Sequence, residues 1–133
     1  MTNSPRYGNL FASVARTATP TPSTPQRTAG SAVLQLTITV TANPGAQTLT
    51  PILYGSVPGA VAPGTAGTTM LTFPNITANG TFNYLIGVGT GTVTAGTTFA
   101  GAVAGIPPPA VWSVGLTHSA AGSWTYQVDY AAA

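Results

Sequence analysis

The 133-residue sequence predicts an all-β fold, an antiparallel β-sandwich of the jelly-roll or immunoglobulin-like type with an extended N-terminal arm. Three observations lead to this prediction. Apolar and hydroxyl-bearing residues alternate with a period of two in several short segments. Turns rich in Gly and Pro separate those segments, and no segment has the apolar period of about 3.6 residues that marks a surface helix. We expect the arm to cover residues 1–30 and the sandwich to cover residues 31–133.

The arm contains a strap, residues 17–30, in which three prolines stand among Thr and Ser. Proline fixes φ and removes a backbone donor, so the strap is predicted to be extended and is neither helix nor central strand. A disordered tail is the other interpretation that the composition allows. A purely solubilising tail would not need the apolar residues before the strap, so we expect that patch to dock on another surface. It consists of Leu10, Phe11 and Val14.

The first predicted strand covers residues 32–41, where apolar residues alternate with Gln and Thr. This alternation is typical of an antiparallel strand with one buried face and one solvated face. Asn43-Pro44-Gly45 ends the strand. Its inward residues are expected to be Leu34, Leu36, Ile38 and Val40.

Three further strands are predicted over residues 49–54, 69–73 and 81–88, and a fourth, shorter one within residues 92–99. Pro51 lies inside the first of these, and because proline donates no ladder hydrogen bond we expect an edge strand or a bulge there. In the strand over residues 81–88, the residues expected on one face are Phe82, Tyr84, Ile86 and Val88.

The last two predicted strands flank Ala120-Ala121-Gly122 and are expected to form a hairpin, with Gly122 in the left-handed conformation. One register sets apolar residues against apolar residues along a single face. It places Trp112 opposite Tyr130, Val114 opposite Val128, Leu116 opposite Tyr126, and His118 opposite Trp124.

The ionisable side chains are too few for most enzyme mechanisms. Charged residues make up 3% of the chain, and Lys, Glu and Cys are absent. Paired carboxylates and thiolate metal sites are therefore excluded within one chain, and in the predicted hairpin Asp129 lies on the opposite face from His118. Residues 87–91 are Gly-rich but lack the Lys and the following helix of a phosphate loop. We expect no enzymatic activity, no cofactor and no metal.

The basic charge lies entirely in the arm, as Arg6, Arg16 and Arg27. Three arginines neutralise few phosphates, so nucleic acid is not an expected partner. A guanidinium pairs well with carboxylates, and we expect these residues to contact a partner protein. The uncharged remainder favours self-association, so we expect a homo-oligomer. Neither a signal peptide nor a membrane-spanning segment is recognisable.

Several motifs resemble a family of small virion proteins of tailed bacteriophages. Residues 9–18 read NLFASVARTA, and members of that family begin with an ASxART element. A strand VLQLTITVTA follows at residues 33–42. The sequence IPPPAVWSVGLTH at residues 106–118, followed by WTYQV at 124–128, is similar to the family's LPxxWxVxxTHxxxxxxTYxV ending.

The resemblance implies a non-enzymatic capsid decoration or cement protein, made in the host cytoplasm and bound to the capsid exterior. Such proteins are often trimeric, with an arm that reaches over subunits of the major capsid protein. Two alternatives stay open. One is a receptor- or carbohydrate-binding module of a tail or fibre, with Tyr54 or Trp112 as a stacking platform. The other is a self-polymerising filament subunit, in which residues 8–17 add a strand to the next copy.

Overall fold

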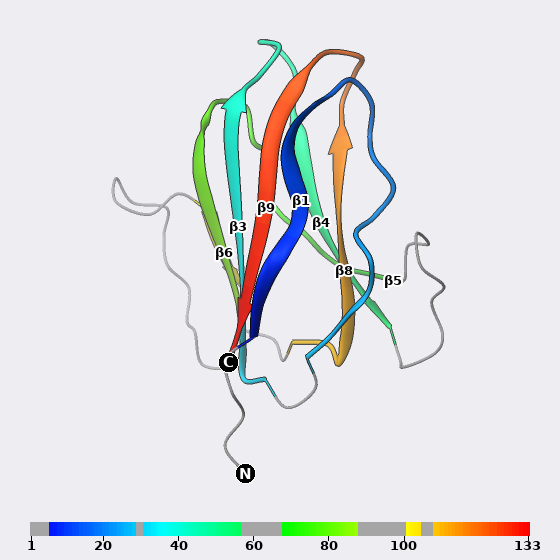
Figure 1. Ribbon diagram of the computed structural model, residues 1–133, viewed down its shortest axis with the longest axis vertical. Helices are drawn as coiled ribbons and strands as arrows, with labels where there is room; N and C mark the ends of the chain where they lie inside the picture. The colour runs from blue at the N-terminus through cyan, green and yellow to red at the C-terminus, as the bar shows by residue number, and fades with distance from the viewer. Residues whose placement is uncertain (1–5, 29–30, 57–67, 88–100, 105–107) are drawn as a thin grey trace.

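The computed structural model describes residues 6–28, 31–56, 68–87, 101–104 and 108–133 (Figure 1). These residues form nine strands and no helix, so none of them lies in a helix long and apolar enough to cross a membrane. The strands are β1 (Arg6–Arg16), β2 (Gln26–Arg27), β3 (Val33–Ala42), β4 (Leu49–Ser56), β5 (Thr68–Thr72), β6 (Gly80–Gly87), β7 (Gly101–Ala104), β8 (Val111–His118) and β9 (Trp124–Ala132).

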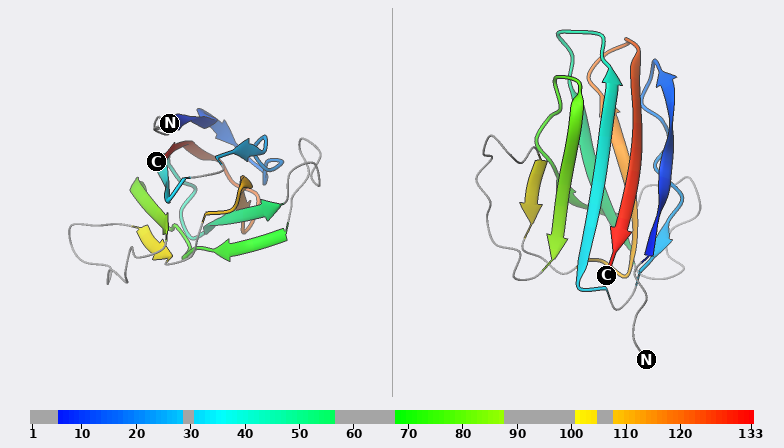
Figure 2. Two further views of the ribbon diagram at one scale, coloured as in Figure 1. Left: turned by 90° about the horizontal axis from the view of Figure 1, so that it is seen from below. Right: turned by 60° about the vertical axis from the view of Figure 1, so that its left-hand side comes forward.

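The strands form two facing sheets, which Figure 2 shows end-on. Sheet A has the order β1-β9-β3-β6-β7 and sheet B the order β2-β8-β4-β5. The antiparallel pairs β1/β9, β2/β8, β3/β6 and β4/β5 are nested, because each pair lies inside the previous one along the chain. This strand order is that of a jelly roll. The predicted β-sandwich is therefore confirmed, and the immunoglobulin-like alternative is excluded.

The core lies between the sheets, and the period-two pattern of β3 explains which residues enter it. The predicted inward residues of β3 are all at most 2% exposed, while the residues between them are half-buried. Tyr84 and Ile86 of β6 are buried as predicted, and Phe82 packs against the core from its margin. Burying a Leu, Ile or Val side chain contributes about 1.5–3 kcal/mol to the free energy of folding. The four buried side chains of β3 therefore make a large contribution to the stability of the sandwich.

Pro51 does not mark an edge strand, because β4 lies between β8 and β5. The N–H and C=O of Leu49 both bond to Ile76, and two residues later the C=O of Pro51 accepts the N–H of Phe73. The missing N–H of Pro51 therefore faces the irregular segment 73–76 and leaves the ladder with β8 intact. A bulge does occur in the β4–β5 pairing, between Leu53 and Tyr54.

The predicted C-terminal hairpin is wrong, because β8 lies in sheet B and β9 in sheet A. The chain crosses between the sheets at residues 119–123. Two of the predicted partners nevertheless meet across the core, with ring centroids 5.2 Å apart for Trp112 and Tyr130 and 6.4 Å apart for His118 and Trp124. Two strands whose inward faces oppose each other produce the same apolar pattern as two neighbours in a ladder.

Gly122 is not left-handed, since the glycines with positive φ among the described residues are Gly45 and Gly80. A residue without a side chain is needed at position 122 for a different reason, which is the lack of space. A Cβ at Gly122 would lie 2.6 Å from Nε2 of Gln47 and 2.9 Å from Cβ of Pro44. The glycine therefore allows the turn after β3 to pack closely against the crossing between β8 and β9.

The part of the chain between β6 and β8 contains one strand that was not predicted, and two predictions for it cannot be compared with the structure. The short strand within residues 92–99 and the inward position of Val88 lie outside the described residues. β7 was not predicted, because its sequence GAVA has no polar alternation. It extends sheet A as a parallel neighbour of β6.

The expected arm docks on its own sandwich. β1 pairs with β9 from Arg6 to Arg16, and Phe11 is 8% exposed within the core. Leu10 packs against the core from its margin. The division expected at residue 30, between an arm and a sandwich, is therefore not a division into separately packed parts. Among the described residues, 6–28 contribute β1 to sheet A and β2 to sheet B.

Replacing Phe11 by Ala tests whether β1 is part of the folded core. We expect the free energy of unfolding in urea to fall by about 3 kcal/mol, because a buried ring is replaced by a cavity. Val14→Ala on the same strand is the matched control, since Val14 is 50% exposed. It should change the free energy by less than about 0.5 kcal/mol. Equal effects of the two variants would contradict the docking of β1.

Candidate functional site

The proline-containing strap runs along the edge of β8 that faces away from β4, and its short strand β2 pairs with β8 there (Figure 1). Ser and Thr residues next to its prolines make hydrogen bonds to β8. Ser23 donates its N–H to the C=O of Val114 at 2.8 Å, and its Oγ accepts the N–H of Val114 at 2.8 Å. Thr19 Oγ1 accepts the N–H of His118 at 2.9 Å. The strap therefore covers an edge that would otherwise be open to strand pairing with another chain.

Arg16 is engaged within its own chain. Its guanidinium donates to the C=O of Ala12, Val14 and Tyr126 at 2.7, 3.1 and 3.0 Å. It also lies 4.6 Å from the ring centroid of Tyr126 and 5.3 Å from that of Phe11, within the range of cation–π attraction. Arg16 therefore fixes the end of β1 on β9, rather than presenting a free guanidinium to a partner.

His118 lies between the sheets, next to this arginine site. Its Nε2 is 3.1 Å from Oη of Tyr126, and its ring packs edge-on against Tyr126 and Trp124. His118 Nδ1 and Trp124 Nε1 are buried and have no hydrogen-bond partner among the described residues. Burial, and secondarily the charge of Arg16, lower the pKa of His118. Burial raises the pKa of Tyr126 to about 12, against the opposing effect of Arg16.

Asp129 lies on the outer face of sheet A and His118 on the inner side. The predicted separation of these two residues is therefore seen, although the hairpin register used to argue for it is wrong. Asn9 Nδ2 donates to Oδ1 of Asp129 at 2.9 Å, and Gln127 Nε2 donates to Oδ2 at 2.7 Å. No group of three His, Cys, Asp or Glu residues able to hold a metal ion occurs in the described part of the chain.

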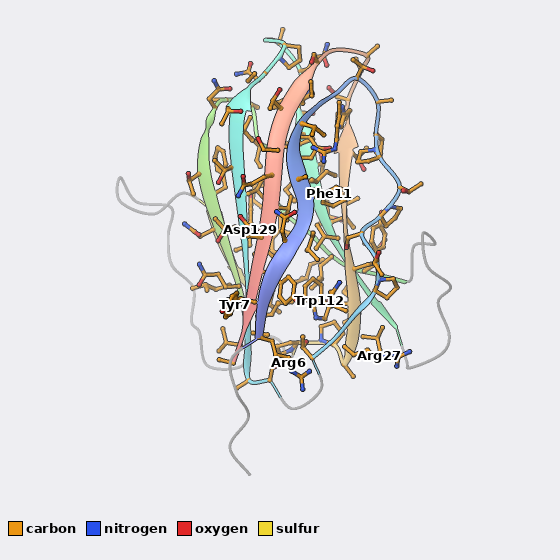
Figure 3. All side chains as sticks on the ribbon, viewed as in Figure 1. Arg6, Tyr7, Phe11, Arg27, Trp112 and Asp129 are labelled. Carbon is orange, nitrogen blue, oxygen red and sulfur yellow. The ribbon has the colours of Figure 1, made fainter. Side chains whose placement is uncertain are left out.

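The exposed charges gather at one end of the sandwich, where Figure 3 shows Arg6 and Arg27. Arg6 Nη1 donates to the C=O of Arg27 at 2.6 Å, and both side chains are exposed. Tyr7, beside them, is 82% exposed. Of the six expected partner contacts, Arg6, Val14 and Arg27 are at the surface, whereas Leu10, Phe11 and Arg16 contact their own chain. Tyr7 was missed, although an aromatic residue in a polar N-terminal sequence was a signal for it.

The two aromatic residues expected as carbohydrate platforms are not free. Trp112 is 1% exposed, and its Nε1 donates to Oγ1 of Thr28 at 2.8 Å, so the prediction for Trp112 is wrong. Tyr54 is half-buried over Gly115, where an added Cβ would be 2.7 Å from Cε2 of Tyr54. Trp112 also packs on Tyr130 of sheet A, so both rings are engaged by their own chain.

No protein-family model matches the chain, and no curated protein matches its sequence.

Replacing Ser23 by Ala tests the docking of the strap. The buried N–H of Val114 would lose its hydroxyl acceptor, so we expect the free energy of unfolding to fall by about 1–3 kcal/mol. Thr24→Ala is the matched control, because Thr24 is exposed and its hydroxyl makes no hydrogen bond in the described residues. If the two variants unfold at the same urea concentration, the strap is not held by Ser23.

The lowered pKa of His118 predicts that acid destabilises the fold. Its pKa in the folded protein lies below its ordinary value of 6.5, so the unfolded chain binds the proton more strongly. The stabilising contribution is complete above pH 6.5 and is lost as the pH falls through 6.5 toward the lowered folded pKa. Urea titrations across this range should show the loss in the native sequence and a flatter dependence in His118→Asn. An unchanged slope in the variant would assign the pH dependence to another group.

Proposed function

We propose that the chain is a structural virion protein, a decoration subunit that binds the outside of a major capsid lattice. The observation that carries this proposal is a jelly roll with nearly uncharged sheet faces, whose exposed arginines are confined to one end. Jelly rolls are common among viral capsid proteins, and this fold-level analogy adds to the motif resemblance. The faces of the sandwich suit contact with neighbouring copies, with a trimer as the preferred assembly.

The end that carries Arg6 and Arg27 is the proposed capsid contact. Two exposed guanidinium groups fit carboxylates on a partner. A subunit that binds only the assembled lattice stabilises it by its binding free energy. This arrangement differs from an arm that reaches across subunits, because residues 6–28 dock on their own sandwich.

In the filament alternative, residues 8–17 would have to add a strand to the sheet of the next copy, and the pairing within the chain stands against this. β1 already fills the position beside β9 that residues 8–17 would fill in a neighbouring copy. Polymerisation by that route therefore needs β1 to leave its own sheet and enter another. The docked position of β1 makes this alternative the weaker one.

Co-sedimentation with purified capsids that lack the protein tests the decoration proposal. We expect the native chain to saturate capsids at a fixed ratio to the major capsid protein. The double variant Arg6→Ser, Arg27→Ser should bind about 10-fold more weakly, or ~1.4 kcal/mol, and with less dependence on salt. Met70→Ala, an exposed residue of β5, is the control and should bind normally. Absence of binding, or only a few copies per particle, would exclude a decoration role.

A further inference from the structure

The outer face of sheet A carries an exposed aromatic ring beside a small residue. The register places Tyr7 of β1 next to Ala131 of β9, and Ala131 next to Gln35 of β3. Leu85 of β6 continues the same row. Adjacent strands are about 4.8 Å apart, so Tyr7 and Gln35 are separated by about 10 Å of sheet, with only a methyl group between them. This row therefore places an aromatic ring and an amide on either side of a small residue.

The next row on the same face is entirely polar. It runs across Asn9, Asp129, Thr37 and Asn83, one residue from each of four adjacent strands. Figure 3 shows Asp129 and Tyr7 on the face of sheet A that is turned toward the viewer. Gln35 Nε2 bonds to Oδ1 of Asn83 at 3.2 Å, and this links the two rows.

The hydrogen bonds within these rows fix which atoms remain free. A carboxylate only accepts, so Asn9 and Gln127 must turn their NH₂ groups toward Asp129. The amide oxygens of Asn9, Gln127 and Gln35 then have no partner among the described residues. The face therefore presents three amide oxygens as hydrogen-bond acceptors next to an exposed ring. It also presents the NH₂ group of Asn83 as a donor, because Oδ1 of Asn83 accepts from Gln35 and Thr37.

From this arrangement we propose that the outer face of sheet A binds a neutral saccharide, with Tyr7 as the stacking platform. A sugar ring has an apolar C–H face that packs on an aromatic ring, and hydroxyl groups that donate to acceptors. Asp129 is the strongest acceptor in the site because it is charged. The site does not depend on capsid binding, and it would serve attachment to a glycan-bearing surface.

Other ligands fit this face less well. Anions such as phosphate are disfavoured, because the negative charge of Asp129 on this face repels them. A metal ion is disfavoured, because Asp129 is the single carboxylate of these rows and no group of three His, Cys, Asp or Glu residues occurs in the described part of the chain. A second copy of the chain packed face to face would bury Asp129, and no arginine lies among the residues of these rows to pair with it.

Ligand-observed saturation-transfer NMR with lactose, maltose, cellobiose and N,N′-diacetylchitobiose tests the site. We expect the native chain to bind at least one of these sugars, with a Kd on the order of 1 mM. Tyr7→Ala should abolish the saturation transfer, and Tyr7→Phe should retain it, because the ring rather than the hydroxyl stacks. Asp129→Asn should weaken binding about 10-fold through loss of the charged acceptor.

Val14→Ala provides the matched control, because Val14 is also an exposed apolar residue of β1 but lies toward the other end of that strand. It should bind the sugar like the native chain. Three results would overturn the proposal. They are no transfer to any of the four sugars, transfer that survives Tyr7→Ala, and a change in light-scattering mass on Tyr7→Ala without any sugar binding. The last result would identify the face as a contact between copies.

Discussion

The structure depends on aromatic contacts between two consecutive strands that lie in different sheets. Trp112 of β8 meets Tyr130 of β9 at one end of the sandwich, and His118 meets Trp124 and Tyr126 at the other. These rings hold the sheets at a fixed separation over the full length of both strands. All other strands except β7 pair with β8 or β9, or with a strand that does, and β7 is added at the far edge of sheet A beside β6.

The N-terminal segment completes the same two strands. β1 pairs with β9 and β2 pairs with β8, and the strap between them passes from one sheet to the other. Tyr130 connects the parts, because its Oη donates to Oε1 of Gln26 at 3.3 Å and its ring lies against Gly8, where a Cβ would be 2.9 Å away. Residues 6–28 therefore cover the edges of β8 and β9 and pack on the aromatic contact between them. A partner can reach only the surfaces that these residues leave exposed.

Short-range patterns in the sequence predicted the strands well and their arrangement poorly. The alternation in β3 identifies its buried face, because a period of two is a property of one strand. The pattern in β8 and β9 is the same whether two strands are neighbours or face each other, so a hairpin was predicted where the chain crosses between sheets. The engagement of Arg16 and the exposure of Tyr7 depend on β9, which lies far away in the sequence, and composition alone did not reveal either.

The nesting of the strand pairs also governs the order in which the fold can form. Asn9 and Asp129 are hydrogen-bonded neighbours although 120 residues separate them. β1 therefore waits for its partner until β9 has been synthesised, and closing so long a loop is slow. During that interval β3 and β6 can pair. Once β9 is present, its edge is open to the β1 of its own chain or of a neighbouring chain. At high local concentration, the β1 of a neighbouring chain can therefore compete with the chain's own β1 for this edge, which is the route to a domain-swapped dimer.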